Sequence, residues 1–229
     1  MTLRLDLSTA FPRAVGLTRG RAILGITGSP GAGKSTYAEE LVRDLTILGH
    51  KVALVPMDGF HLSQAALDER GLGPVKGAPQ TFDASGYVAL LRRLRDPDDS
   101  VVWAPRFDRG LEDPIAASIP IGPDVTLVVT EGNYLLYEKG PWATVRPLLD
   151  ECWYVDLDEA ERHRRLEARH RRFGRTPEQA HERTMGSDET NARLIAATAS
   201  RADAVLQVGD QTRMPLANAS LNTTDSSPS

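Results

Sequence analysis

A glycine-rich segment near the start of the chain has the residue types needed to hold the phosphates of a nucleotide. Residues 28–35 read Gly-Ser-Pro-Gly-Ala-Gly-Lys-Ser, which fits the pattern G-x-x-x-x-G-K-[ST] at every fixed position. Glycines let the backbone curl so that successive N–H groups point at phosphate oxygens. Lys34 is expected to reach the β- and γ-phosphates, and the Ser35 hydroxyl to ligate Mg²⁺. The expected phosphate-binding residues are Gly28, Ser29, Pro30, Gly31, Ala32, Gly33, Lys34, Ser35 and Thr36.

Acidic side chains stand at the ends of two apolar runs that predict buried strands. Asp58 follows residues 51–56, and Glu131 follows residues 125–130. In an open α/β sheet the carboxyl ends of the strands line the ligand crevice. Asp58 could there accept the proton of an attacking hydroxyl, although an aspartate before a glycine is also common in simple turns. Glu131 could contact Mg²⁺, with a polar strand end as the alternative, so Ser35 and Glu131 are the candidate metal ligands.

Arginines recur at three- and four-residue spacing over residues 158–172, which indicates one face of a helix. They are Arg162, Arg165, Arg169 and Arg172. Such a stripe could close over the triphosphate and neutralise charge during transfer, in which case Arg165 binds nucleotide and Arg169 acts in catalysis. The alternative is a solvated face paired with Glu161 and Glu167.

The elements that must position these residues follow from the pattern of apolar runs. Five runs predict strands, at residues 21–27, 51–56, 125–130, 152–157 and 204–208. Helical spacing or helix-start residues mark 34–48, 64–69, 87–94, 142–149, 158–172, a segment from Thr176–Pro177 onward, and 191–198. The pattern predicts the α/β P-loop fold, with a five-stranded, mainly parallel sheet flanked by helices and a helical lid.

Several segments are less regular. Residues 1–20 predict a short helix or an extended lead-in, and residues 101–103 a short strand followed by a charged loop at 106–114. Residues 115–123 predict a short strand or hairpin. Residues 59–82 form a long segment rich in glycine and proline, which in a compact domain is usually functional.

Length and composition limit the organisation of the chain. Its 229 residues suit one domain, which we place at 21–208 with a lid at about 158–176, after the lead-in at 1–20. The polar tail at 209–229 is expected to be disordered. The net charge of −4 gives no reason to expect nucleic acid as a partner, and no apolar run long enough for a membrane span is found. The single cysteine, Cys152, fits a reducing cytoplasm.

Further motifs occur together in one order over residues 22–208. They are Gly-Ile-Thr-Gly-Ser-Pro-Gly-Ala-Gly-Lys-Ser at 25–35, Met-Asp-Gly-Phe-His at 57–61, Lys-Gly-Ala-Pro-Gln-Thr-Phe-Asp at 76–83, Phe-Asp-Arg at 107–109 with Glu-Asp-Pro at 112–114, Glu-Gly-Asn-Tyr-Leu-Leu at 131–136, and Asn-Ala-Arg-Leu-Ile at 191–195. With these motifs the chain resembles the uridine kinase, phosphoribulokinase and type I pantothenate kinase group of P-loop kinases. It is most similar to short bacterial members described as nucleoside or sugar kinases, including fructose-transport-associated ones.

The resemblance implies a kinase that uses ATP and Mg²⁺ to phosphorylate a hydroxyl of a small metabolite. Asp58 matches the acceptor-activating aspartate, Glu131 the acidic residue near Mg²⁺, and Arg169 falls in the lid, so that Asp58, Lys34, Glu131 and Arg169 are the candidate catalytic residues. The implied acceptor-site residues are Asp58, His61, Lys76, Phe82, Arg106, Asp108 and Tyr134. His61 could equally lie at the surface, and Arg106 and Arg109 could instead pair with Glu112 and Asp113 to shape their loop.

Departures from the family leave the acceptor open among a sugar, a nucleoside and a pantothenate-like alcohol. The chain is shorter than pantothenate kinases and lacks their aromatic-rich C-terminal part. It reads Asp-Gly-Phe-His at 58–61, where uridine kinases have Asp-Ser-Phe-Tyr. Relatives in this family are often dimers, which raises a homodimer as one oligomeric state.

Two rival functions remain. A P-loop ATPase or GTPase acting on a protein partner, such as a metallochaperone-like protein, usually carries metal-binding cysteines or histidines, whereas this chain has one cysteine and five scattered histidines. A non-catalytic nucleotide-binding regulator has no need to keep Lys34, Ser35, Asp58 and Glu131 together.

Overall fold

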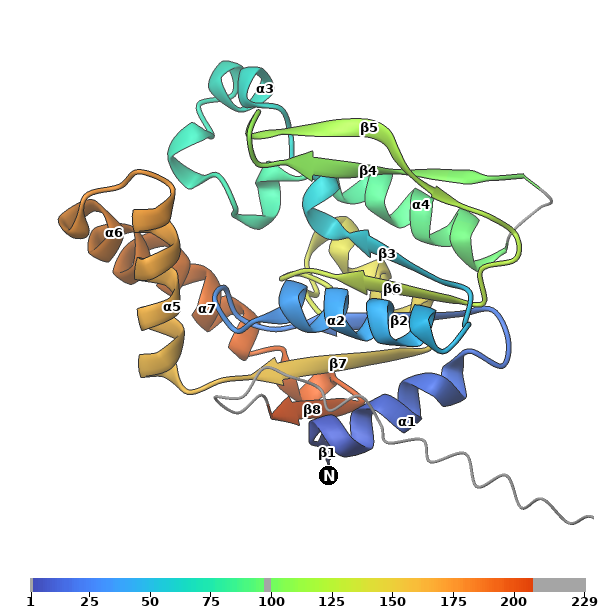
Figure 1. Cartoon of the computed structure of the whole chain (residues 1–229). Helices are drawn as coiled ribbons and strands as arrows, with labels where there is room; N and C mark the ends of the chain where they lie inside the picture. Colours follow the sequence, from blue (N-terminus) through green and yellow to red (C-terminus); the bar gives the residue numbers. More distant parts are fainter. Residues whose placement is uncertain (1, 97–99, 208–229) are drawn as a thin grey trace, which may run out of the picture.

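The computed structural model describes residues 2–96 and 100–207 (Figure 1). The expected disordered tail at 209–229 lies outside the described residues. Among the described helices, none has the length and apolar character needed to cross a lipid bilayer.

A central sheet of six parallel strands organises the chain, in the order β1-β8-β7-β2-β6-β3. The strands are β1 (Leu3–Leu5), β2 (Ala22–Thr27), β3 (Val52–Pro56), β6 (Leu127–Glu131), β7 (Glu151–Asp156) and β8 (Ala204–Gln207). The α/β class and the parallel sheet are therefore confirmed. The sheet has one strand more than the five expected, because β1 pairs with the edge of β8. Only Leu5 of β1 is buried, so this strand carries almost no apolar signal.

Helices cover both faces of the sheet, and alternate strand residues pack on opposite sides. On one face α1 (Leu7–Leu17) and α2 (Lys34–Ile47) pack over Leu127 and Val129. On the other, α4 (Ala84–Arg95) and α7 (Glu189–Ala196) pack in the cluster that holds Val128. This alternation is the period of two expected for a strand with two buried faces.

The expected helix at 142–149 is instead two short 3-10 turns, Gly140–Thr144 and Arg146–Leu148. Pro147 lies inside the expected helix, where it lacks an N–H to donate and its ring clashes with the preceding turn. The apolar spacing of this segment predicted the buried side chains correctly but not the backbone, since Trp142, Val145 and Leu149 are all buried.

A separate antiparallel ribbon, β4 (Val102–Asp108) with β5 (Asp113–Ile121), stands above the sheet in Figure 1. It replaces most of the charged loop expected at 106–114, of which only the turn between the strands remains. The ribbon packs on the 3-10 turn Met57–Phe60 that follows β3. A Cβ at Gly59 would lie 2.4 Å from the carbonyl oxygen of Pro105, so glycine is required for this contact.

The glycine- and proline-rich segment after β3 is ordered by short elements. They are α3 (Gln64–Glu69) and the 3-10 turns Gly73–Val75 and Pro79–Thr81. An isolated antiparallel bridge joins His61 to Phe82 and closes the segment into a loop. In Figure 1 this loop lies at the edge of the sheet where β3 ends.

The lid predicted at about 158–176 corresponds to α5 (Glu159–Arg172); α6 (Pro177–Arg183) follows it, so that we use the word lid for both helices, and a π-helical turn, Thr184–Asp188, joins α6 to α7. Both starts match the sequence prediction. Asp158 accepts the Glu161 amide at 3.1 Å, and Thr176 caps α6 in a reciprocal pair with Gln179. Figure 1 shows α5 and α6 beyond the carboxyl edge of the sheet, with α5 nearer to the phosphate loop.

Candidate active site

The phosphate loop connects β2 directly to α2, as its sequence requires. Gly31 and Gly33 have φ angles of 82° and 94°, a left-handed backbone that favours glycine. Gly33 caps α2 without a side-chain hydrogen bond, so the first amides of the helix are available to an anion. Lys34 is 7% exposed and its Nζ donates to the Ser29 carbonyl at 3.1 Å. The loop is therefore already curled in the form that binds phosphate.

The lid helix α5 lies against this loop. A Cβ at Gly31 would lie 2.7 Å from Cγ of Leu166, and a Cβ at Gly33 would lie 3.4 Å from Nη1 of Arg165. Arg165 also donates to Glu161 at 2.6 Å, as the alternative reading of the stripe expected, while its guanidinium lies beside the phosphate loop. Arg165 is thus positioned to contact a bound nucleotide.

Strand register brings Glu131 to the phosphate loop and to Asp58. Glu131 lies opposite Ile26 of β2 on one side and opposite Pro56 of β3 on the other. Asp58 follows Pro56 by two residues. Tyr87 donates to the Thr130 hydroxyl at 2.7 Å, which in turn donates to the Val55 carbonyl at 2.7 Å. This buried chain of hydrogen bonds fixes the two strand ends that carry the carboxylates.

The two candidate metal ligands lie close together. Glu131 is 5% exposed, and the Ser35 hydroxyl is near enough to its carboxylate to favour the charged form. Burial and the nearby charge of Asp58 raise the pKa of Glu131 to about 7, against the opposing effects of Lys34 and Ser35. Burial also lowers the pKa of Lys34 to about 8, although Glu131 and Asp58 favour its charged form. A hydroxyl and a carboxylate at this point are oxygen ligands of the kind that suits Mg²⁺.

Asp58 lies just after β3, next to the ribbon. Its side chain is 34% exposed, and its Oδ2 lies 3.6 Å from Nη2 of Arg109. His61 stacks on Phe82 with ring centroids 3.9 Å apart and lies 5.1 Å from the Phe107 ring. Burial lowers the pKa of His61, and its Nδ1 is buried without a hydrogen-bond partner among the described residues. His61 therefore belongs to an aromatic wall beside Asp58 rather than to the open surface.

Other predicted acceptor residues build the walls of this region. Lys76 Nζ donates to the Glu112 carbonyl at 2.9 Å and lies 5.4 Å from the centroid of the Phe107 ring. Tyr134 is fully buried and its hydroxyl donates to the Gly77 carbonyl. Asp108 accepts the Gly110 and Leu111 amides at 2.9 and 3.0 Å, which shapes the ribbon turn.

The pairing suggested for the charged loop is wrong. Arg106 lies 3.9 Å from Asp108, and Arg109 pairs with Asp58. Of the two carboxylates expected to pair with these arginines, Glu112 pairs with Lys76 at 3.7 Å and Asp113 accepts the Gln64 amide at 2.8 Å. The ribbon folds the charged residues onto partners from α3 and from the loop at 73–81, which local spacing in the sequence could not indicate.

Arg169 of α5 is exposed and lies near enough to this region to feel its charges. The charges that act on it are those of Asp188, Arg109, Asp58 and Arg183. Arg169 therefore lies between the lid and the acceptor side, where a transition-state charge could be stabilised.

A contact that the sequence analysis missed joins the lid to the acceptor loop. Arg183, the last residue of α6, donates to the carbonyl oxygens of Lys76 at 2.7 Å and Pro74 at 3.3 Å. The two partners are more than 100 positions apart along the chain, so no local pattern could have shown the contact. It ties the position of α6 to the loop that faces Asp58.

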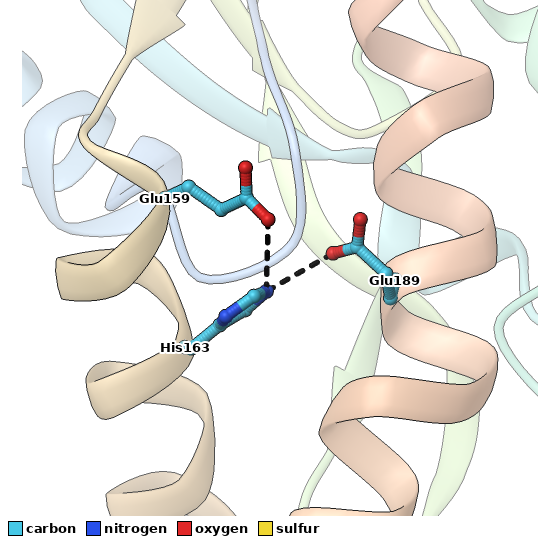
Figure 2. Close-up of side chains that lie close together, drawn as sticks. All are labelled: Glu159, His163 and Glu189. Atoms are coloured by element: carbon cyan, nitrogen blue, oxygen red, sulfur yellow. Dashed lines mark hydrogen bonds and ion pairs between the residues drawn. The ribbon is translucent and has the colours of Figure 1, made fainter.

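A second missed feature is the ionic cluster that holds α5 to α7 (Figure 2). His163 Nε2 lies 3.0 Å from Glu189 Oε2 and 3.9 Å from Glu159 Oε1. Although these three side chains have the types that bind metals, both Glu189 oxygens already accept from arginines, Arg162 on one and Arg193 on the other. We interpret the cluster as an ion-pair clasp between the two helices.

The clasp predicts a pH-dependent contribution to stability. Burial would raise the pKa of Glu189, but hydrogen bonds from His163, Arg162 and Arg193 outweigh it and lower the pKa to about 2. A carboxylate with a lowered pKa stabilises the fold above its unfolded pKa of about 4.3, and that stabilisation is lost as pH falls toward 2. Glu189→Gln should therefore cost about 3 kcal/mol at pH 7 and about half of that at pH 3, where the unfolded carboxyl is protonated but the folded one is still ionised, measured by urea unfolding.

Glu159→Gln is the matched control, because Glu159 is exposed and only 3.9 Å from His163. Its effect should stay within about 0.5 kcal/mol at both pH values. Equal effects of Glu189→Gln at pH 7 and pH 3 would contradict the clasp.

The Arg183 contact predicts that the lid orders the acceptor loop. Arg183→Ala removes two charge-assisted hydrogen bonds, so amide exchange over residues 73–81 should rise about tenfold or more. Hydrogen–deuterium exchange with mass spectrometry measures this without substrate. Arg175→Ala, at an exposed position between α5 and α6, should leave these amides unchanged, and an equal rise in both variants would refute the coupling.

Comparisons with known proteins show which proteins this chain resembles. A family model described as the methylmalonyl Co-A mutase-associated GTPase MeaB matches residues 7–63. A Schizosaccharomyces pombe protein named "Putative uridine kinase" is 33% identical over 207 residues, which cover 86% of this chain and 88% of that protein. A pantothenate kinase of Mycolicibacterium vanbaalenii is 33% identical over 136 residues, covering 58% of this chain and 43% of that protein.

A solved structure shows the same fold over nearly its whole length. The crystal structure titled "putative fructose transport system kinase" from a Silicibacter species has a TM-score of 0.79 and 33% identity, covering 88% of this chain and 98% of that one. The Schizosaccharomyces pombe and Silicibacter matches cover 86% and 88% of this chain, so they extend far beyond the phosphate loop. The chain belongs to the P-loop kinase family that includes uridine kinase-like and pantothenate kinase proteins.

Proposed function

We propose that this chain transfers the γ-phosphoryl group of ATP, with Mg²⁺, to a hydroxyl of a small metabolite such as a sugar, a nucleoside or a pantothenate-like alcohol. The observation that carries the proposal is the place of Asp58. Its carboxylate acts electrostatically on Lys34 and Glu131 at the phosphate end of the site, yet it stays one-third exposed on the side of the aromatic wall. An acceptor hydroxyl can therefore reach a base that stands next to the γ-phosphate.

Each residue has a distinct task in the transfer. Lys34 and the loop amides hold the β- and γ-phosphates, and Arg165 and Arg169 add charge from the lid. Asp58 orients the acceptor hydroxyl and accepts its proton while the oxygen bonds to the γ-phosphorus and the bond to the β–γ bridging oxygen breaks. Ser35 and Glu131 would hold Mg²⁺, which supplies charge neutralisation on the phosphate oxygens when bound.

Support for the acceptor class is limited to what relatives share. Their names mention uridine, pantothenate and fructose transport, which share an alcohol group rather than a ring or a charge. His61, Phe82 and the loop at 73–81 form the wall where such an acceptor would lie. A cytoplasmic setting belongs to the same proposal, because nucleotide and metabolite are both intracellular reactants.

A second function is favoured by the match to the GTPase model, namely nucleotide hydrolysis coupled to a protein partner. That match covers residues 7–63, the strand–loop–helix–strand segment with Asp58 that kinases and GTPases share. The match at 33% identity covers 86% of the chain and includes the elements beyond this segment. Release of ADP over a panel of alcohols supports the kinase, whereas turnover of nucleotide without any acceptor supports hydrolysis.

Asp58→Asn tests the proposed base. The amide keeps the size of the carboxylate but cannot accept the proton, so kcat should fall about 10²- to 10⁴-fold. The Kd for ATP should change less than about threefold, because the phosphates are held by Lys34 and the loop. ADP release and binding of a fluorescent ATP analogue measure the two quantities.

Asp96→Asn, at the exposed end of α4, is the control and should leave both quantities unchanged. If Asp58→Asn lowers ATP affinity as much as turnover, Asp58 is a nucleotide-binding residue and the role as base is lost.

A further inference from the structure

We propose that the acceptor carries an anionic group, a carboxylate or a phosphate, and that Arg109 binds this group beside the hydroxyl that Asp58 activates. The inference rests on the proposed kinase function and narrows its substrate class.

Arg109 is held in place by the turn of the ribbon. It follows the last residue of β4, Asp108, whose carboxylate accepts the amides of Gly110 and Leu111. Glu112 closes the turn with a φ of 56°, a left-handed conformation that non-glycine residues seldom adopt. Since the close approach of Gly59 to Pro105 fixes the ribbon on the turn that carries Asp58, Arg109 and Asp58 have a defined relation.

The guanidinium of Arg109 has N–H donors to spare. Its Nη2 lies 3.6 Å from Asp58 Oδ2, longer than the 2.7–2.9 Å of a charge-assisted hydrogen bond, and its side chain is 55% exposed. Lys76 and Arg183, two other cations of this region, use their donors on backbone carbonyls, and Arg106 lies 3.9 Å from Asp108. Arg109 therefore offers a planar, two-pronged donor of the kind that binds carboxylate and phosphate.

The charges around Arg109 place it where the acceptor must lie. It acts electrostatically on Glu131 and on Arg169 as well as on Asp58. The nucleotide phosphates have cations of their own, Lys34 and Arg165, on the phosphate loop. An acceptor anion that takes over the donors of Arg109 would leave the Asp58 oxygens to the reacting hydroxyl, so binding and activation of the acceptor are linked.

The test compares alcohols that differ by one anionic group. ADP release is measured with glycerate and glycerol, pantothenate and pantothenyl alcohol, and fructose 6-phosphate and fructose. We expect at least one anionic member to have a kcat/KM at least about tenfold above its neutral partner. Arg109→Ala should raise the KM of that acceptor about 10- to 100-fold and remove the preference, with the Kd of a fluorescent ATP analogue unchanged.

Arg109→Lys keeps the charge and should retain part of the preference. Arg93→Ala, at an exposed position of α4, is the matched control and should behave as the unchanged chain. The inference is overturned if neutral alcohols are accepted as well as or better than their anionic partners, or if Arg109→Ala affects both members of a pair equally. A fall in ATP affinity instead would assign Arg109 to the γ-phosphate. If no alcohol releases ADP, the proposed kinase function fails as well.

Discussion

The pairing of β6 between β2 and β3 is the constraint on which the site depends. Glu131 ends β6 opposite residues of both neighbours, so a single register sets its distance from the phosphate loop and from Asp58. The same register sends Val128 to one core and Leu127 and Val129 to the other. A shift of β6 by one residue would turn Val128 into the core of Leu127 and Val129 and the reverse, and would at the same time displace the Glu131 carboxylate. Packing of the core and placement of the acidic groups are therefore one requirement, met by the same strand.

Burial of opposite charges at the end of these strands has a clear chemical effect. Lys34 and Glu131 are both nearly inaccessible to solvent. Burial lowers the pKa of Lys34 and raises that of Glu131, so it favours the neutral form of each side chain. Under the proposed function, bound phosphates would favour the charged form of Lys34 and a bound Mg²⁺ the charged form of Glu131. Asp58, in contrast, remains partly exposed to solvent.

Much of the fold followed from local patterns, because strong signals occurred where both faces of an element are buried. The runs at 21–27 and 125–130 and the phosphate loop between strand and helix were correctly identified, as were the capped starts of α5 and α6. The strand β1 was not, since one buried residue in three gives no period. The ribbon was underestimated because its outer face is polar or exposed, and Pro147 changed an expected helix into two tight turns.

The residues of the site likewise fall into those that local patterns predicted and those that only the complete fold reveals. Lys34 and Ser35 were predicted from the phosphate-loop pattern, and Glu131 from its place at the end of a predicted buried strand. Both signals are local in the sequence. Arg109, Arg183 and Glu189 act on partners brought near only by the complete fold, and single-sequence spacing holds no record of such pairs. The predicted roles of the acceptor residues stay predictions. The contacts of Lys76, Asp108 and Tyr134 show that these residues also build the wall, so their replacement would alter shape as well as binding.

The π-helical turn Thr184–Asp188 sets the rotation of α6, the last helix of the lid, relative to α7. An α-helix advances by about 100° per residue, so removing one residue from this turn would rotate α6 against α7 by roughly that angle. Arg183, just before the turn, would then point away from the loop at 73–81, while Glu189, just after it, would stay clasped to α5. The number of residues in this turn is thus as constrained as their identity. Insertions and deletions among relatives should therefore occur in other parts of the lid.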